Sequence, residues 1–261
     1  MELRYIVVLI QLIRIRVNWT WQAICSIKRN SNACLFSDIQ KNTLIIVPHA
    51  DDEWVGCSQI IRHVKNVSVL YLNFPQVVKD KNATIREKEL RQCGEEQNFN
   101  LHFCEPGDVS KTLRVIRDNK IEQLFFPSFW DWHPDHIQAV QHVVCALSSD
   151  DIKLNLYMYQ ISCPILSIKN IYYLKVKNKW KMFNKYYKSQ RHLPVYRFQL
   201  HEILNSVFYN VGFFPIEIYM KINLCKLKKI TLKSNPDLSK KICNIRLIRQ
   251  KSEFYFKNIF R

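Results

Sequence analysis

Glycine is scarce in this chain, which has only four among its 261 residues. Such a composition is unusual for an enzyme but does not exclude one. The sequence also contains no internal repeat and no low-complexity tract. Its apolar content of 48%, with aromatic residues spread along the whole length, argues against intrinsic disorder. A chain of this length can bury a full core, so the composition predicts a single globular α/β unit.

The sequence contains no C-x-x-C pair. Its cysteines are odd in number, and their spacing fits neither a disulfide framework nor a thiolate zinc site. Several of them lie within apolar runs, as small buried hydrophobic residues do. We therefore expect reduced thiols and a cytoplasmic protein. The nine cysteines are Cys25, Cys34, Cys57, Cys93, Cys104, Cys145, Cys163, Cys225 and Cys243.

The apolar run near the N-terminus, residues 5–13, is too short to cross a bilayer, and Arg14 and Arg16 interrupt it. It lacks a convincing small-residue cleavage site, which argues against a signal peptide. Residues 3–28 combine arginine with Ile, Leu and Trp, so they could form a basic amphipathic helix. Such a helix would either lie on a membrane surface or pack on the protein's own core, and the sequence favours neither.

Acidic residues are few outside the middle of the chain. Residues 1–43 carry six Lys/Arg and two Asp/Glu, residues 44–150 carry eleven and fifteen, and residues 151–261 carry twenty-two and five. The net charge of +17 therefore resides in the two flanks. Basic flanks fit an anionic membrane, an acidic substrate or nucleic acid, or simply a lysine-rich solvated surface. No RNA- or DNA-binding motif is visible, so nucleic acid is the weakest of these partners.

Apolar runs alternate with helix-forming segments between residues 43 and 160. This alternation predicts a mostly parallel sheet with helices on both faces. Strands are expected over 43–47, 67–72, 101–104, 121–126 and 154–160, and an exposed strand over 171–177. Helices are expected over 54–64, 82–98, 110–119 and 134–147, with Ser110 as an N-cap. We expect an α/β domain over 43–225, a basic amphipathic extension over 1–42 and a basic extension over 226–261.

Two clusters of possible metal ligands follow predicted strands. Residues 48–53 (PHADDE) come directly after the first strand, and residues 133–136 (HPDH) follow the strand at 121–126. In a parallel α/β sheet, the loops at the carboxyl ends of the strands line the ligand crevice. The matched placement of the two clusters predicts that they meet at one site.

The residue types in these clusters suit a catalytic metal. Such zinc sites have three protein ligands and one open position, and we expect His49, Asp52 and His136 to be the ligands. The same donor set also accepts Fe²⁺. Asp51 could accept a proton from a metal-bound water. His133 could stabilise the developing oxyanion or protonate the leaving amine.

Both clusters also have a purely structural interpretation. The acidic residues at 51–53 could stabilise the N-terminus of the following helix, and residues 133–135 could form a turn and cap. The first interpretation leaves His49 unexplained. Both would also have to hold at two matched loop positions, so we favour the metal site.

The segment LIIVPHADDEWVGCSQII resembles the metal-binding opening of the PIG-L/LmbE-like de-N-acetylase family, and HPDH resembles that family's second motif, H-x-D-H. The resemblance implies a Rossmann-like α/β fold and zinc-dependent deacetylation of an N-acetylglucosamine-type conjugate. It also implies the same roles as the reasoning above: His49, Asp52 and His136 on the metal, Asp51 as general base and His133 as transition-state stabiliser.

Weaker similarities lie further along the chain. The pattern Arg86-x-x-Glu89-Leu90 resembles the family's arginine–glutamate helix, which implies that Arg86 binds substrate. A surface ion pair of Arg86 with Glu87 or Glu89 is the alternative. Residues 187–190 (YKSQ) look like a Y-x-S-Q stretch found in bacterial members. Ala50 stands where the family usually has proline, a change that affects loop stiffness rather than a ligand.

Together these observations predict a metal-dependent hydrolase that removes acetyl from an N-acetylated sugar. The alternative is a non-catalytic glycan- or anionic-lipid-binding protein on the same scaffold. The basic flanks favour a phosphate-bearing or lipid-linked conjugate, and peripheral contact with the inner face of an anionic membrane. Residues 58–59 and 73–75 depart from the family pattern near the expected sugar pocket, so the sugar itself stays open.

Overall fold

The computed structural model describes residues 33–74, 83–131, 133–148, 152–165, 167, 169–191, 193 and 195–233. The amphipathic helix expected over residues 3–28 lies outside these ranges, as does most of the expected C-terminal extension. Within the described ranges, no helix is both long enough and apolar enough to cross a membrane.

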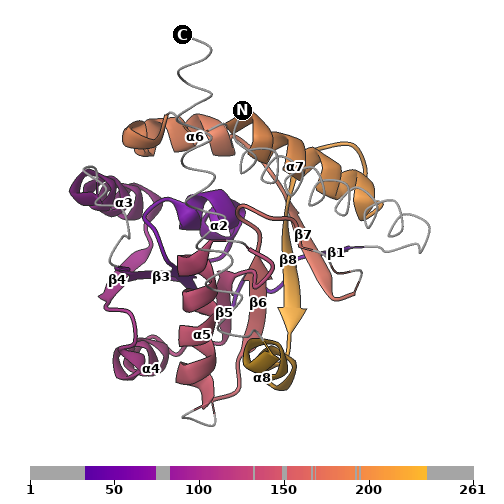
Figure 1. Cartoon of the computed structure of the whole chain (residues 1–261). Coiled ribbons are helices and arrows are strands. Elements are labelled where there is room, and N and C mark those ends of the chain that lie inside the picture. Colours follow the sequence, from indigo (N-terminus) through magenta and orange to yellow (C-terminus); the bar gives the residue numbers. More distant parts are fainter. Residues whose placement is uncertain are drawn as a thin grey trace, which may run out of the picture.

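One eight-stranded sheet runs through the described part of the chain, in the order β1-β7-β8-β6-β5-β2-β3-β4 (Figure 1). Strand β8 is antiparallel to both of its neighbours, and the remaining pairs are parallel. The predicted α/β class, with a mostly parallel sheet, is confirmed. The strands are β1 Cys34–Leu35, β2 Thr43–Val47, β3 Val67–Leu72, β4 Asn100–Cys104, β5 Gln123–Pro127, β6 Asn155–Tyr159, β7 Ile171–Lys175 and β8 Ile216–Ile222.

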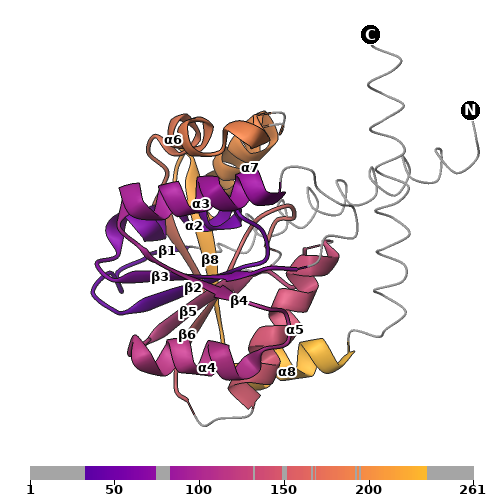
Figure 2. The same cartoon turned by 90° about the vertical axis from the view of Figure 1, so that its left-hand side faces the viewer.

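Helices cover both faces of the sheet. Helices α2, α3, α6 and α7 lie on one face, and α4, α5 and α8 lie on the other (Figure 2). The helices are α2 Asp52–His63, α3 Ala83–Gln97, α4 Val109–Asp118, α5 Pro134–Ser148, α6 Lys179–Tyr186, α7 Val195–Phe208 and α8 Leu224–Lys233, with a short 3₁₀ turn, η1, at Lys188–Gln190.

The position of strand β2 in the middle of the sheet explains why its sequence is a continuous apolar run. All five of its residues are buried. Ile45 and Val47 pack in the core beneath α2 and α3, whereas Leu44 and Ile46 pack in the core on the α4–α5 side. A strand buried on both faces has no position for a polar side chain that points to solvent, so the usual alternation is lost.

Most predicted elements agree with the structure to within one or two residues, and α4 supplies a correction. We predicted Ser110 as its N-cap, but Asp108 is the cap: its carboxylate accepts a hydrogen bond from the Lys111 backbone N–H at 3.0 Å. A capping side chain accepts from the second or third residue of the helix, and Lys111 is the third residue after Asp108. Ser110 lies inside the first turn instead.

The predicted domain boundaries stay predictions, although regular structure extends past both of them. β1 precedes residue 43 and pairs with β7, and α8 continues beyond residue 225. The strand predicted over 171–177 is β7, which ends at Lys175. The lysine- and aromatic-rich segment that follows it forms α6.

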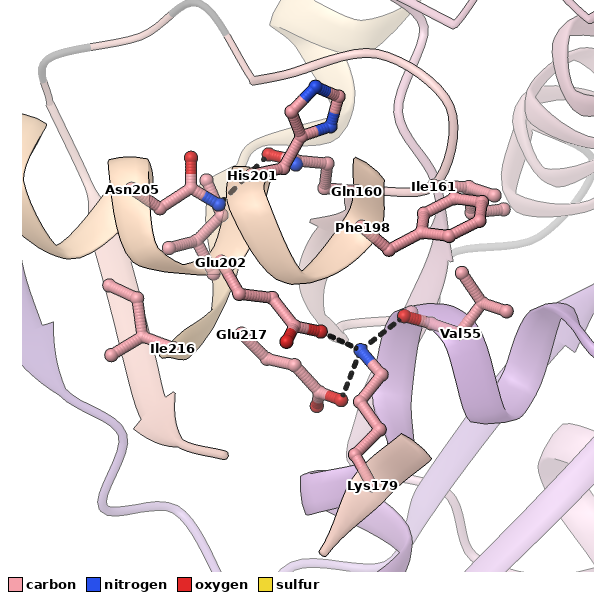
Figure 3. A pocket seen from close by; sticks show the side chains of 12 residues that line it. Val55, Gln160, Ile161, Lys179, Phe198, His201, Glu202, Asn205, Ile216 and Glu217 are labelled. Carbon is pink, nitrogen blue, oxygen red and sulfur yellow. Dashed lines mark hydrogen bonds and ion pairs between the residues drawn. The ribbon is translucent and has the colours of Figure 1, made fainter. Parts of the chain in front are cut away.

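A buried ionic cluster lies between α2 and the α6–α7 pair. The Lys179 ammonium donates to the Val55 carbonyl at 2.6 Å and lies 2.7 Å from Glu202 Oε1 and 2.9 Å from Glu217 Oε1 (Figure 3). A cavity of about 20 Å³ adjoins it, which is room for about one water molecule. The cluster therefore joins α2, α6, α7 and β8 at one buried point.

Candidate active site

The order of the strands places the two motifs together. From β2 the chain passes to β3 and β4 on one side, and then returns to form β5 on the other side of β2. The connections therefore leave β2 and β5 in opposite directions, and such a point opens a crevice at the carboxyl ends of the strands. His49 follows β2 and His133 follows β5, so both motifs reach that crevice.

The loop after β2 turns into α2 within four residues, and Asp51 has the backbone conformation that makes this possible. Its φ of 129° lies in a region that non-glycine residues rarely adopt. The His49 backbone N–H donates to Asp52 Oδ2 at 3.0 Å, and the Asp51 carbonyl accepts from Trp54 N–H at 3.0 Å. Strained backbone of this kind is found at functional sites, where the surrounding contacts hold it in place.

The three predicted metal ligands lie close together, with Asp52 beside both histidines. Its Oδ2 lies 3.1 Å from His49 Nδ1 and 3.4 Å from His136 Nε2. Donors about 2.0–2.2 Å from a tetrahedral zinc are separated by about 3.3–3.5 Å from one another, so these two spacings suit one shared ion. The side chains of His49, Asp52 and His136 are only 11%, 6% and 3% exposed.

His133 is placed as a further donor. The imidazoles of His49, His133 and His136 each offer one nitrogen, and these nitrogens lie within 4.8 Å of one another. The ring centroid of His133 lies 4.7 Å from that of His49 and 4.6 Å from that of His136. The site can therefore hold a metal through three histidines or through two histidines and Asp52, and the assignment of Asp52 stays a prediction.

Two carboxylates at the site were not assigned a role from sequence. Asp135 Oδ2 lies 2.8 Å from His49 Nε2 and 3.8 Å from His133 Nδ1. Asp131 Oδ2 lies 3.1 Å from His136 Nδ1. The signal was present in the spacing D-x-H-P-D-H, because Asp131 and Asp135 flank the two histidines of the second motif.

The charges at the site fit a bound cation. Four carboxylates are buried here (Asp51, Asp52, Asp131 and Asp135), and the Arg86 guanidinium pairs with one of them, Asp51. Burial lowers the pKa of His136, but the adjacent Asp131 and Asp52 carboxylates outweigh burial and raise it overall. Buried negative charge needs a positive partner, which a divalent metal on oxygen and imidazole donors would supply.

Arg86 contacts the predicted general base. Its Nη2 donates to Asp51 Oδ1 at 2.7 Å and to the Ala50 carbonyl at 3.0 Å. Burial raises the pKa of Asp51 to about 6, and the Arg86 charge opposes that rise. Neither sequence interpretation of Arg86 named Asp51 as its partner, and its role in binding substrate stays a prediction.

The YKSQ segment also supports the loop after β2. The Tyr187 hydroxyl donates to Glu53 Oε1, and Glu53 Oε2 accepts from the Asp51 backbone N–H at 3.1 Å. Burial raises the pKa of Glu53 to about 8. Ser189 donates from its hydroxyl to Glu89 on α3 at 2.6 Å. This segment therefore ties the first turn of α2 to α3, a role that the sequence pattern did not reveal.

Neither a protein-family model nor a curated protein sequence matches this chain. Solved structures do match its fold. The conserved protein TT1542 from Thermus thermophilus is 18% identical, with a TM-score of 0.57 over 70% of this chain and 95% of that one. The zinc-inhibited form of the teicoplanin deacetylase Orf2 is 12% identical, with a TM-score of 0.52 over 70% and 99%.

A third solved structure is that of an enzyme with a different reaction. GalB, the 4-carboxy-2-hydroxymuconate hydratase from Pseudomonas putida KT2440, is 12% identical, with a TM-score of 0.50 over 70% of this chain and 97% of that one. The chain therefore has the fold of solved deacetylases, and the same fold also occurs in a hydratase. Since one fold can host several reactions, the function must be argued from the site.

Proposed function

We propose that this chain is a metal-dependent hydrolase that removes the acetyl group from an N-acetylated sugar. The observation that carries the proposal is the meeting of His49, Asp52 and His136 at one buried point, with the Asp51 carboxylate next in sequence. The fold shared with a solved deacetylase supports it. The alternative of a non-catalytic binding protein gives no reason for a buried base beside three metal donors.

Each residue of the site has a distinct task in this proposal. Arg86 holds the Asp51 carboxylate, which accepts a proton from the attacking water. His133 stabilises the developing oxyanion or protonates the leaving amine, with Asp135 near its ring. When bound by His49, Asp52 and His136, a divalent metal would polarise the acetyl carbonyl and lower the pKa of water.

Zinc is our proposed metal, and an N-acetylglucosamine-type conjugate is the proposed substrate. Two imidazoles and one carboxylate accept zinc and Fe²⁺ alike. The solved teicoplanin deacetylase Orf2 is in a zinc-inhibited form. The choice between the two metals is therefore part of the test.

The test is acetate release from a panel of N-acetylated sugars after metal removal and return. The panel includes free N-acetylglucosamine, a nucleotide-linked form, a lipid-linked form and a thiol glycoside. We expect the chelated protein to lose activity, because its site then lacks the charge that polarises the carbonyl. Zn²⁺, or Fe²⁺ under anaerobic conditions, should restore it.

The matched control is His63→Ala, which removes an exposed histidine of α2 that bonds the Gln59 carbonyl. This variant should respond to metal as the wild type does, whereas His49→Ala should stay inactive when metal is returned. Acetate release that persists without metal would contradict the proposal. Sugar binding without acetate release from any member of the panel would favour the non-catalytic alternative.

We also propose that the N-acetylated sugar substrate carries a phosphate or a lipid, and that the protein binds it at the cytoplasmic face of an anionic membrane. In support, residues 152–201 contain no Asp or Glu, and Lys175, Lys181, Lys188 and Arg191 are exposed there. Basic surface residues attract anionic lipid, and salt screens that attraction. The protein should sediment with phosphatidylserine vesicles at low salt and not with neutral vesicles. Equal recovery with both vesicle types, or with neither, would contradict this.

A further inference from the structure

Asp131 is buried in the loop after β5 and contacts the loop after β6. Its backbone N–H donates to the Ser128 carbonyl at 3.0 Å, directly after β5. Its side chain is 1% exposed. A carboxylate this deeply buried is stable only if its oxygens are satisfied by hydrogen bonds or positive charge.

Two hydrogen bonds and one close imidazole contact surround the Asp131 carboxylate. Oδ1 accepts a hydrogen bond from the His133 backbone N–H at 3.0 Å. Oδ2 accepts from the Ser162 backbone N–H at 2.9 Å and lies 3.1 Å from His136 Nδ1. One side chain therefore contacts both histidines of the HPDH motif, one through its backbone and the other through its ring.

The contact with His136 determines what the other ring nitrogen can do. An imidazole that places Nδ1–H against a carboxylate keeps its lone pair on Nε2. In this chain His136 Nε2 is the atom that lies 3.4 Å from Asp52 Oδ2, on the side where the metal donors meet. The ring is thus aimed at the site by a carboxylate on its far edge, an arrangement that orients histidine ligands in metal sites.

We propose that Asp131 is a positioning residue for the metal: it holds His136 with Nε2 directed at the ion and orders the turn that carries His133. This inference rests on the proposed function, because it assumes that His136 binds a metal. A merely structural Asp131 would join the loops at Ser128 and Ser162 without changing how the protein binds metal.

The test compares metal affinity in Asp131→Asn and in wild-type protein, with Zn²⁺ titrated against a chromophoric chelator. Asparagine keeps the size of the side chain, but it replaces one carboxylate oxygen, which accepts hydrogen bonds, with an NH2 group, which donates them. In either orientation the NH2 group faces a backbone N–H, that of His133 or that of Ser162, so one of the two bonds that fix the side chain is lost. The negative charge beside His136 Nδ1 is lost as well, so the ring is held less firmly. We expect zinc binding to weaken by about 10–100-fold.

The matched control is Asp108→Asn, which changes the cap of α4 in the same chemical way. It should leave zinc affinity unchanged. Should Asp131→Asn fail to fold, Asp131→Glu and Asp131→Gln are compared instead. Their side chains have the same shape, but only Glu carries a charge. The Glu variant should therefore bind zinc more tightly than the Gln variant. The circular dichroism and thermal unfolding of each metal-free variant confirm that the fold survives.

The outcomes separate this inference from the function on which it rests. Wild-type affinity in Asp131→Asn, or equal affinity in the Glu and Gln pair, would overturn the positioning role and leave the hydrolase proposal intact. A wild-type protein that binds no zinc, cobalt or iron at this site would overturn both. Weakened binding in Asp108→Asn equal to that in Asp131→Asn would show a general loss of stability and would also overturn the positioning role.

Discussion

Replacing Asp51 with asparagine should lower kcat for acetate release by about 10²–10⁴-fold, the range that a general base contributes. Asparagine fills nearly the same volume and can still accept the Arg86 hydrogen bond that Asp51 Oδ1 accepts at 2.7 Å. It also tolerates positive φ better than most residues do, which matters at a position with φ of 129°. The variant lacks the group that can take a proton, and with it the charge that pairs with Arg86. The measurement is kcat on the best substrate of the panel, with zinc affinity recorded in parallel.

Zinc affinity should change little in Asp51→Asn, because the proposed ligands are His49, Asp52 and His136. Asp38→Asn is the control, since Asp38 is partly exposed and pairs with Lys41 at 2.8 Å. It should retain full activity. An unchanged kcat in Asp51→Asn, with metal bound, would exclude Asp51 as the base.

Replacing Lys179 with methionine should lower the free energy of unfolding by about 3–5 kcal/mol, which is typical when one partner of a buried ion pair is removed. Lys179 is 2% exposed and is the cation between Glu202 and Glu217 (Figure 3). Without it, two carboxylates remain buried near one another, and the Val55 carbonyl on α2 loses its donor. Urea unfolding at pH 7 measures the loss.

Lys181→Met on the same helix is the matched control, because Lys181 is exposed. Its effect should stay within about 0.5 kcal/mol, as for other surface substitutions. Adding Glu202→Gln and Glu217→Gln to Lys179→Met should recover part of the lost stability, since the uncompensated charge is then gone. Equal unfolding free energies for Lys179→Met and Lys181→Met would show that the buried cluster contributes nothing to stability.

The central part of the fold could be predicted because its signals are local. The run at 43–47 has no polar residue after Thr43, which is enough to indicate a strand buried on both faces. The helix cap at α4 shows the limit of this approach. Ser and Asp are both residue types that favour the N-cap, and Asp108 and Ser110 lie two positions apart. Only the hydrogen bond from the Lys111 backbone N–H shows that Asp108 is the cap.

The site could be predicted only in part. His49, Asp52 and His136 were predicted to be metal ligands from residue type, spacing and position after strands. The structure brings them together, and their role as ligands stays a prediction. Asp131 was missed because its contact with His136 depends on how the turn after β5 folds. The partner of Arg86 was missed because α3 had to be placed against the α2 loop before Asp51 came within reach.

Residue order alone determined the alternation of strands and helices, the two motifs at strand ends and the donor types that suit zinc. These depend on chemistry within a few residues of each position, which a sequence displays directly. The folded chain decided which carboxylate contacts which histidine, that Tyr187 supports Glu53, and that Lys179 neutralises two glutamates 23 and 38 residues further along. Such contacts join distant segments, and their distances follow from packing of the whole sheet and its helices, which no local pattern encodes.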